Sequence, residues 1–228
     1  NLYTAVIRIL DEDMNTVETV GTKFGFRSVA VDGTHLLVNG KAVKLRGVIY
    51  ADYTFDADGV VDYDLVESDL KRMKQLNINA IRTAVYSPAD QRFYELCDKY
   101  GFYVICDANL NPFSTQTKVI ATDNGYSDFF ASRVQNMYEQ FKNHSSIIAW
   151  SLGASRDNGS CMTTAYKQLK MKDRGRPVIF SGAGYGDNTD VIALENATYD
   201  QVRQYLGRPQ SRPLLLFSYG SSQGNGMG

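Results

Sequence analysis

Reactive side chains are scarce in this sequence of 228 residues, which contains only two histidines and three cysteines. The cysteines, Cys97, Cys106 and Cys161, are odd in number and lack the spacing of metal ligands, so we expect them to be buried or incidental. A serine nucleophile needs a base within hydrogen-bond reach. His35 lies in a predicted hairpin, and His144 precedes a predicted strand. Neither follows the carboxyl end of a strand, where a catalytic group would be expected, so a serine hydrolase is disfavoured.

Long apolar runs and a strong charge of one sign are also absent. No run approaches the roughly 20 apolar residues that a membrane helix needs, and the opening "NLYTAVIRIL" has no secretory-signal pattern. The net charge of -1 argues against nucleic acid or an anionic membrane surface as the main partner. With 43% hydrophobic and 21% charged residues, the composition is typical of a soluble globular protein and indicates no compartment.

The first part of the chain alternates in the manner of β-strands. Residues 1–28 contain "LYTAVIRIL", a polar turn and "TVETVGTKFGF", a pattern that predicts an antiparallel hairpin. A lone hairpin buries too little apolar surface to be stable, so we interpret residues 1–28 as the end of a β-sandwich domain. A second hairpin follows, with Asn39-Gly40 as its tight turn.

From about residue 40 onward, short apolar strands alternate with helices. This alternation predicts a parallel sheet covered by helices, and no glycine-rich phosphate-binding fingerprint follows the first strand. Seven strands are expected, one fewer than a (β/α)8 barrel has. The predicted strands are 43–48, 78–86, 102–110, 146–153, 177–182, 190–195 and 213–219, and the predicted helices are 62–77, 87–101 and 127–144, with Ser87 and Ser127 as N-caps and Gly101 as a stop.

The stretch "WSLGASRDNGS" at residues 150–160 resembles a strand end that opens into a loop, a common location for catalytic residues. Its tip, Ala154-Ser155, nevertheless carries no carboxylate, histidine or cysteine.

Several stretches resemble motifs of glycoside hydrolases of family 2 and occur in the same order along the chain. The resemblance is strongest to the β-galactosidase type. The stretches include "LLVNGKAVKLRGV", "DLKRMKQLNINAIRTAVY", "FYELCDKYGFYVICDANL", "RVQNMYEQFKNHSSIIAWSLG" and "RPLLLFSYGSSQGNGMG". The resemblance implies an α/β fold of the (β/α)8 TIM-barrel type over residues 29–228, lacking its eighth strand. It also implies that residues 1–28 are the end of an immunoglobulin-like β-sandwich.

The family hydrolyses glycosides with a carboxylic acid and a nucleophilic carboxylate about 5–5.5 Å apart. The resemblance places the acid/base in W-S-L-G-N-E, where this chain has Ser155, and the nucleophile before a tyrosine, where it has Ser218. Neither position carries a catalytic carboxylate. Asn111 and Phe113 replace the magnesium-binding Glu and His of galactosidases, and Val85 and Ala51 replace substrate-binding histidines, so we expect no metal or other cofactor.

Other side chains near predicted strand ends could contact a carbohydrate. The candidates are Asp107, Asn109, Tyr86, Trp150, Tyr219 and Glu195. Each has a plainer alternative: Asp107 would hold Arg82, Glu195 would be a solvated loop acid, and Tyr86 and Trp150 would be packing residues.

Three hypotheses remain open. The chain is a catalytically inactive family 2 barrel that binds a carbohydrate or a partner, an active β-glycosidase with relocated carboxylates, or a structural fragment of a larger protein with no ligand. In each case we expect the rest of the polypeptide or another chain to complete the barrel, because a barrel strand without a neighbour leaves unpaired backbone groups.

Overall fold

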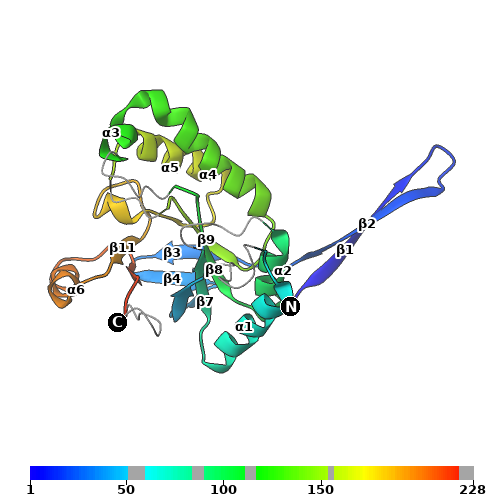
Figure 1. Cartoon of the computed structure of the whole chain (residues 1–228), viewed down its shortest axis with the longest axis horizontal. Coiled ribbons are helices and arrows are strands. Elements are labelled where there is room, and N and C mark those ends of the chain that lie inside the picture. Colours follow the sequence, from blue (N-terminus) through cyan, green and yellow to red (C-terminus); the bar gives the residue numbers. More distant parts are fainter. Residues whose placement is uncertain (51–59, 84–89, 111–116, 154–156, 221–228) are drawn as a thin grey trace.

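The computed structural model describes residues 1–50, 60–83, 90–110, 117–153 and 157–220 (Figure 1). Its body is a curved parallel sheet with helices on its outer side, and a long two-stranded hairpin extends away from the body at the N-terminal end. None of the described helices is long and apolar enough to cross a membrane.

Seven parallel strands form the body, as the sequence predicted. Strands β6 to β10 pair in chain order, a parallel bridge between Ile179 and Val191 joins β10 to β11, and β11 pairs with β12. This arrangement is an unclosed barrel, because no described strand lies between β12 and β6. The strands are β6 (Gly47–Ile49), β7 (Ala80–Thr83), β8 (Tyr103–Asp107), β9 (Ile147–Ser151), β10 (Val178–Ile179), β11 (Ile192–Glu195) and β12 (Leu214–Phe217).

The helices outside the sheet include three predicted ones and three that were missed. Predicted were α1 (Tyr63–Gln75), α2 (Gln91–Tyr100) and α4 (Ser127–Phe141); missed were α3 (Thr117–Thr122), α5 (Ser160–Lys172) and α6 (Tyr199–Leu206). Two short 3-10 helices, η1 (Asn124–Tyr126) and η2 (Ser181–Ala183), complete the described set.

The helix ends follow local chemistry, with two corrections to the predicted caps. Asp90 caps α2 by accepting a hydrogen bond from the Arg92 backbone, whereas the predicted cap Ser87 lies outside the described residues. Ser127 is already helical and Tyr126 precedes α4, because the 3-10 helix η1 leads directly into it. Gly101 ends α2 with a φ of 69°, as predicted.

Two layers of apolar side chains hold the barrel together. The larger layer lies between the strands and helices and includes the fully buried Trp150, Tyr94 and Phe93. The smaller layer, which includes Ile105 and Ala149, lies on the other side of the sheet. Alternation along the strands separates the two layers, because successive side chains of a strand point to opposite faces.

A three-stranded antiparallel sheet packs against the barrel through Leu36, Val38 and Ile148. It consists of β3 (Val29–Asp32), β4 (His35–Val38) and β5 (Lys41–Ala42). Asn39 and Gly40 have φ values of 52° and 74°, the geometry of the tight turn predicted there.

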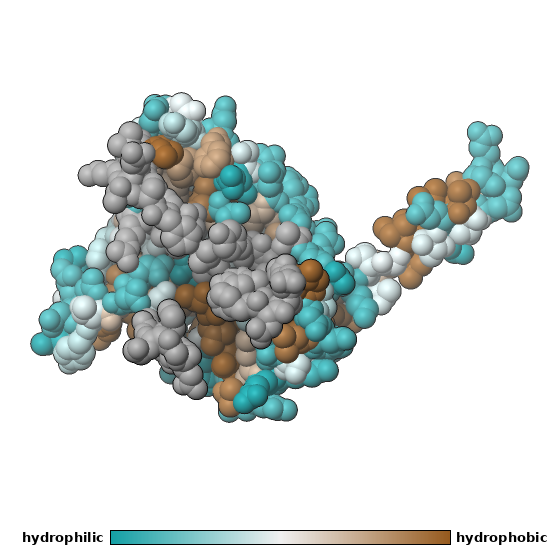
Figure 2. Space-filling view, in the orientation of Figure 1, coloured by the Kyte–Doolittle hydropathy of each residue, from teal (hydrophilic) through white to brown (hydrophobic). Residues whose placement is uncertain are grey.

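The N-terminal hairpin, β1 (Tyr3–Leu10) and β2 (Thr16–Phe24), is confirmed as an antiparallel pair. Figure 2 shows apolar side chains along this projecting arm. Val6 is 62% exposed and Ile7 is 56% exposed. Because neighbouring residues of a strand face opposite sides, both faces of the hairpin are uncovered. Its membership of an immunoglobulin-like sandwich stays a prediction.

Candidate functional site

The carboxyl ends of the parallel strands bring together polar side chains that are distant in the sequence. Arg82 lies in β7, Asp107 and Glu195 are the last residues of β8 and β11, and Ser218 follows β12. In (β/α)8 barrels this end carries the active site. We call this end of the barrel the mouth.

Arg82 lies at the centre of the mouth and is 5% exposed. Its Nε donates to Asp107 Oδ2 at 3.1 Å, and its Nη1 donates to Glu195 Oε1 at 3.0 Å. Its guanidinium also lies 3.9 Å above the centre of the Phe217 ring. Burial by itself lowers the pKa of Arg82, but the two carboxylates outweigh it and raise that pKa. Arg82 therefore stays charged, and both carboxylates are engaged with it.

Asp107 is almost completely buried, with an exposure of 1%. Burial raises the pKa of Asp107, and Arg82 and a hydrogen bond with Ser151 partly oppose that rise. Its backbone N–H donates to Thr83 Oγ1 at 3.0 Å. The alternative that Asp107 holds Arg82 is therefore the interaction observed.

Glu195 lies closer to solvent than Asp107, and its side chain is 18% exposed. Ser218 Oγ donates to Glu195 Oε2 at 3.1 Å. Glu195 is thus not a solvated loop acid, because one of its oxygens binds Arg82 and the other binds Ser218.

The backbone is constrained where two of these strands end. Ser218 has a φ of 53° and Asn196 a φ of 48°. The Asn196 N–H donates to the Phe217 carbonyl oxygen at 3.0 Å, which ties the two segments together. Left-handed backbone at residues other than glycine is costly and concentrates at functional sites, so this feature agrees with a site at the mouth.

Two further candidates lie at the rim, and one does not belong to the site. Asn109 is exposed, and its carbonyl oxygen accepts a hydrogen bond from Arg133. Tyr219 is 57% exposed. Trp150 is fully buried in the layer beneath the helices, and its Nε1 donates to Asp173 at 2.9 Å. The prediction that Trp150 contacts a sugar is therefore wrong, because its indole is a packing residue.

Four predicted positions around the site lie outside the described residues, namely Ala51, Val85, Tyr86 and Ser155. The expectations for Asn111 and Phe113 lie there as well, so the absence of metal stays a prediction. In the described part of the chain, no three His, Cys, Asp or Glu side chains come together as a metal site would require.

Sequence reasoning named Arg82 only as the residue that Asp107 would hold, and it missed the contact of Arg82 with Glu195. The available signal was a charged arginine in the middle of the short predicted strand that contains "NAIRT". Phe217, which packs under the guanidinium, carried no signal of its own.

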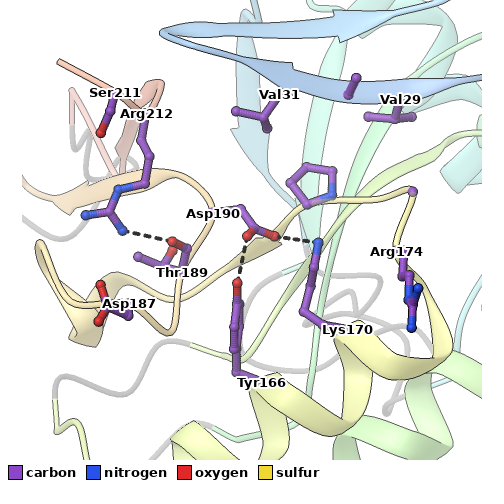
Figure 3. Close-up of a pocket in the computed structure, with 13 residues that line it drawn as sticks. Val29, Val31, Tyr166, Lys170, Arg174, Asp187, Thr189, Asp190, Ser211 and Arg212 are labelled. Carbon is purple, nitrogen blue, oxygen red and sulfur yellow. Dashed lines mark hydrogen bonds and ion pairs between the residues drawn. The ribbon is translucent and has the colours of Figure 1, made fainter.

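A cavity lies at the opposite end of the barrel from the mouth (Figure 3). It measures about 640 Å³ and lies between β3, the C-terminal half of α5 and the segments that lead into β10 to β12. Asp190 accepts from Lys170 at 3.0 Å and from Tyr166 at 2.7 Å, and Arg212 donates to the Thr189 carbonyl oxygen. Its Lys170, Asp190 and Arg212 therefore already have partners in the protein.

Comparisons with known proteins agree with this geometry. The sequence model for the TIM barrel domain of glycosyl hydrolases family 2 matches residues 29–228. The β-galactosidase of Erwinia tasmaniensis is 34% identical over 242 residues, which cover all of this chain and 24% of that protein. The β-galactosidase of Pseudoalteromonas haloplanktis is 36% identical over 242 residues, which cover all of this chain and 23% of that protein. The chain thus spans about a quarter of the length of these relatives.

Solved structures share the fold at lower identity. The apo β-glucuronidase of Ruminococcus gnavus has a TM-score of 0.82 at 21% identity, covering 99% of this chain and 44% of that one. The family 2 β-galacturonidase of Eisenbergiella tayi has a TM-score of 0.81 at 20% identity, with the same coverage. Together with the family match and the β-galactosidase relatives, these likenesses show that the chain belongs to glycosyl hydrolase family 2, with residues 29–228 matching its TIM barrel domain.

Proposed function

We propose that this chain is a β-galactosidase-like barrel that binds a carbohydrate at its mouth and does not hydrolyse it. The observation that supports this proposal most is the identity and the hydrogen bond of the residue that follows β12. Ser218 stands where the family resemblance expects the nucleophile, and its hydroxyl donates to Glu195. This position therefore holds a neutral hydroxyl instead of a carboxylate, and its neighbour Glu195 is also paired with Arg82.

The size of the expected loss supports the same conclusion. Losing a general acid costs on the order of 10²–10⁴ in rate. Losing the nucleophile removes the covalent route of a retaining glycosidase. The proposal therefore assigns no catalytic residue. Glu195, Asn109 and Tyr219 remain as groups around the binding site, and Asp107 supports it by holding Arg82.

A second candidate function is hydrolysis by relocated carboxylates. The specific observation in its favour is that Asp107 and Glu195 lie in one network and that burial raises the pKa of Asp107, as an acid catalyst requires. Against it, Asp107 is 1% exposed, so its oxygens are covered, and both acids bind Arg82. A purely structural role without a ligand is the remaining alternative.

Two measurements separate these functions. Incubation with p-nitrophenyl β-galactoside and β-glucuronide should give no release of nitrophenol above background. Titration with methyl β-D-galactoside, followed by calorimetry or NMR, should show saturable binding. Turnover that survives repurification and disappears in Glu195→Gln would instead support relocated carboxylates. The absence of any sugar binding would leave only the structural role.

A further inference from the structure

The outer strand of the small antiparallel sheet borders the cavity at the end of the barrel opposite the mouth. Strand β3 pairs with β4 along one edge, and no described strand pairs with its other edge. Val29, Ala30 and Val31 of this strand line the cavity, and helix α5 lies across from them (Figure 3). We call this cavity the β3 groove.

The backbone of β3 directs hydrogen-bonding groups toward its outer edge. The carbonyl oxygen of Leu36 in β4 accepts a hydrogen bond from the Val43 N–H at 3.0 Å, so the Leu36 backbone faces away from β3. Its cross-strand partner in β3 is Val31. Because successive pairs of an antiparallel ladder alternate between bonded and non-bonded positions, Val31 and Val29 present their N–H and C=O groups to the β3 groove.

The opposite wall of the groove is held in place by hydrogen bonds. Asp190 accepts from Tyr166 and Lys170 of α5, and from the backbone N–H of Val178 at 2.7 Å. These bonds fix the position of α5 relative to the segment that leads into β11. The groove is therefore a preformed space between an open strand edge and a braced wall.

The size of the groove suits a single extended strand. One residue within stacked sheets fills on the order of 160 Å³, since strands advance about 3.3 Å per residue, lie about 4.8 Å apart and stack about 10 Å apart. The groove measures about 640 Å³. It therefore has room for about four extended residues, and β3 itself has four residues.

Two exposed charges of opposite sign mark the two ends of the groove. Arg174 lies at the end near Val29, whereas Asp187 lies at the opposite end (Figure 3). In the described part of the chain, neither side chain forms an ion pair or a hydrogen bond. The other charged side chains of the lining differ in this respect, because Lys170 pairs with Asp190 and Arg212 donates to carbonyl oxygens.

We propose that the β3 groove binds a short extended segment of a partner protein, which adds to β3 as an antiparallel fourth strand. An extended backbone presents N–H and C=O groups in alternation, as the open edge requires. Antiparallel addition continues the existing sheet and is slightly more stable per residue than parallel pairing. The site is separate from the mouth, and the inference does not depend on sugar binding.

The direction of the added strand defines the charges of the partner. An antiparallel segment has its C-terminal end beside Val29 and its N-terminal end beside Val31. An acidic residue at the C-terminal end would then meet Arg174, and a basic residue at the N-terminal end would meet Asp187. Alternation along the strand places apolar residues between them on the face that continues the half-buried side chains of Val29 and Val31.

The test uses two peptides of identical composition and reversed order, acetyl-Lys-Val-Thr-Val-Glu-amide and acetyl-Glu-Val-Thr-Val-Lys-amide, titrated into the full chain and followed by NMR. We expect the first to bind about threefold or more tightly, because an exposed ion pair changes affinity by a factor of about 1.4 to 5. The charge swap Arg174→Asp with Asp187→Arg should reverse this preference. The same swap on the exposed hairpin, Arg8→Asp with Glu18→Arg, should leave it unchanged.

Hydrogen exchange reports the added strand without any variant. At a concentration of the first peptide about ten times its Kd, exchange of the Val29 and Val31 amides should slow about tenfold. The Ala30 amide, which faces β4, should be protected with or without peptide. The first peptide with both valine nitrogens methylated, which cannot donate from them, should not protect Val29 or Val31.

Binding of neither peptide, or equal binding of both, would overturn the proposal. Binding that leaves the exchange of Val29 and Val31 unchanged would also overturn it, because the peptide would then lie elsewhere. If both amides are already protected before peptide is added, the groove is filled by a second copy or by the chain itself, and a partner segment has no place there.

Discussion

A single buried guanidinium organises the mouth of the barrel at the scale of individual residues. Asp107 and Glu195 were identifiable in the sequence because each follows an apolar strand. The pairing of Asp107 with Arg82 was considered in the sequence, but the contact of Arg82 with Glu195 was not, because these two residues are 113 positions apart and meet only when the strands curve into a barrel. Trp150 was misassigned for a related reason, since the sequence does not tell which face of β9 points toward the helices.

Removing the charge of Arg82 should destabilise the fold. In Arg82→Gln, Asp107 would remain buried without its cation, and breaking a buried pair from one side costs about 3–5 kcal/mol. We expect a loss of this order in the free energy of unfolding, measured with urea. The matched control is Arg92→Gln, since an ion pair as exposed as that with Asp90 should contribute little to stability. Similar losses in the two variants would contradict the assigned role.

The acid Asp98 should make stability depend on pH. Burial raises the pKa of Asp98, but hydrogen bonds from His144 and Ser146 outweigh it and lower that pKa. Ser146 N–H donates to Asp98 Oδ1 at 2.6 Å. A carboxyl group whose pKa is lower in the folded state contributes stability above its unfolded pKa of about 3.9, and this stability is lost as the pH falls through the folded pKa.

Asp98→Asn should therefore be less stable than the unmodified chain at pH 7, and its stability should decline less on acidification from pH 5 to pH 3. Urea unfolding across this range measures both effects. The exposed Asp13→Asn provides the control and should change neither. Parallel pH profiles for Asp98→Asn and the unmodified chain would refute the prediction.

Among the elements, strands were easier to predict than helices. Seven short apolar runs matched seven strands, because a buried parallel strand is a continuous hydrophobic segment. Helix α5 was missed since no side chain caps it at Gly159 and its buried face includes the small residues Cys161 and Ala165. Helix α6 has only eight residues, too few for a clear period.

The turn after β9 should tolerate no side chain at Gly153. This residue has a φ of 94°, and a Cβ atom there would lie 2.3 Å from the Leu110 carbonyl oxygen. Gly153→Ala should lower the free energy of unfolding by well over the roughly 1 kcal/mol expected from strained φ alone. Gly101→Ala is the matched control, because Gly101 has a φ of 69° with open space around it. Equal midpoints in urea for both variants would show that the turn can relax.

The whole molecule has uncovered surface in two places. Strands β6 and β12 are the ends of the parallel sheet, and Ile49 and Leu216 at these edges are 46% and 39% exposed. The hairpin exposes Val6 and Val17 by 62% and 67%. Unpaired strand edges and bare apolar faces promote association, so we expect further polypeptide, from the same or another chain, to cover them.

Residues 1–228 expressed alone should therefore not behave as an independent monomer. Light scattering coupled to gel filtration should detect association, and the thermal transition should be broad. A chain with Val6→Thr and Val17→Thr, which makes the hairpin more polar, should associate less if the arm contributes. A soluble monomer with a sharp, cooperative transition would contradict this expectation.

The hydroxyl of Tyr219 donates to the carbonyl oxygen of Gly47 at 3.1 Å, across 172 residues of sequence. This bond joins the segment after β12 to the start of β6. We call these two facing edges of the unclosed barrel the seam. Amide hydrogens along the seam should exchange with deuterated water within the shortest labelling times, whereas those of β8, which pairs on both sides, should be protected longest. Tyr219→Phe should accelerate exchange in β6 while leaving β8 unchanged, and equal protection of all strands would show that the strands separate only by global unfolding.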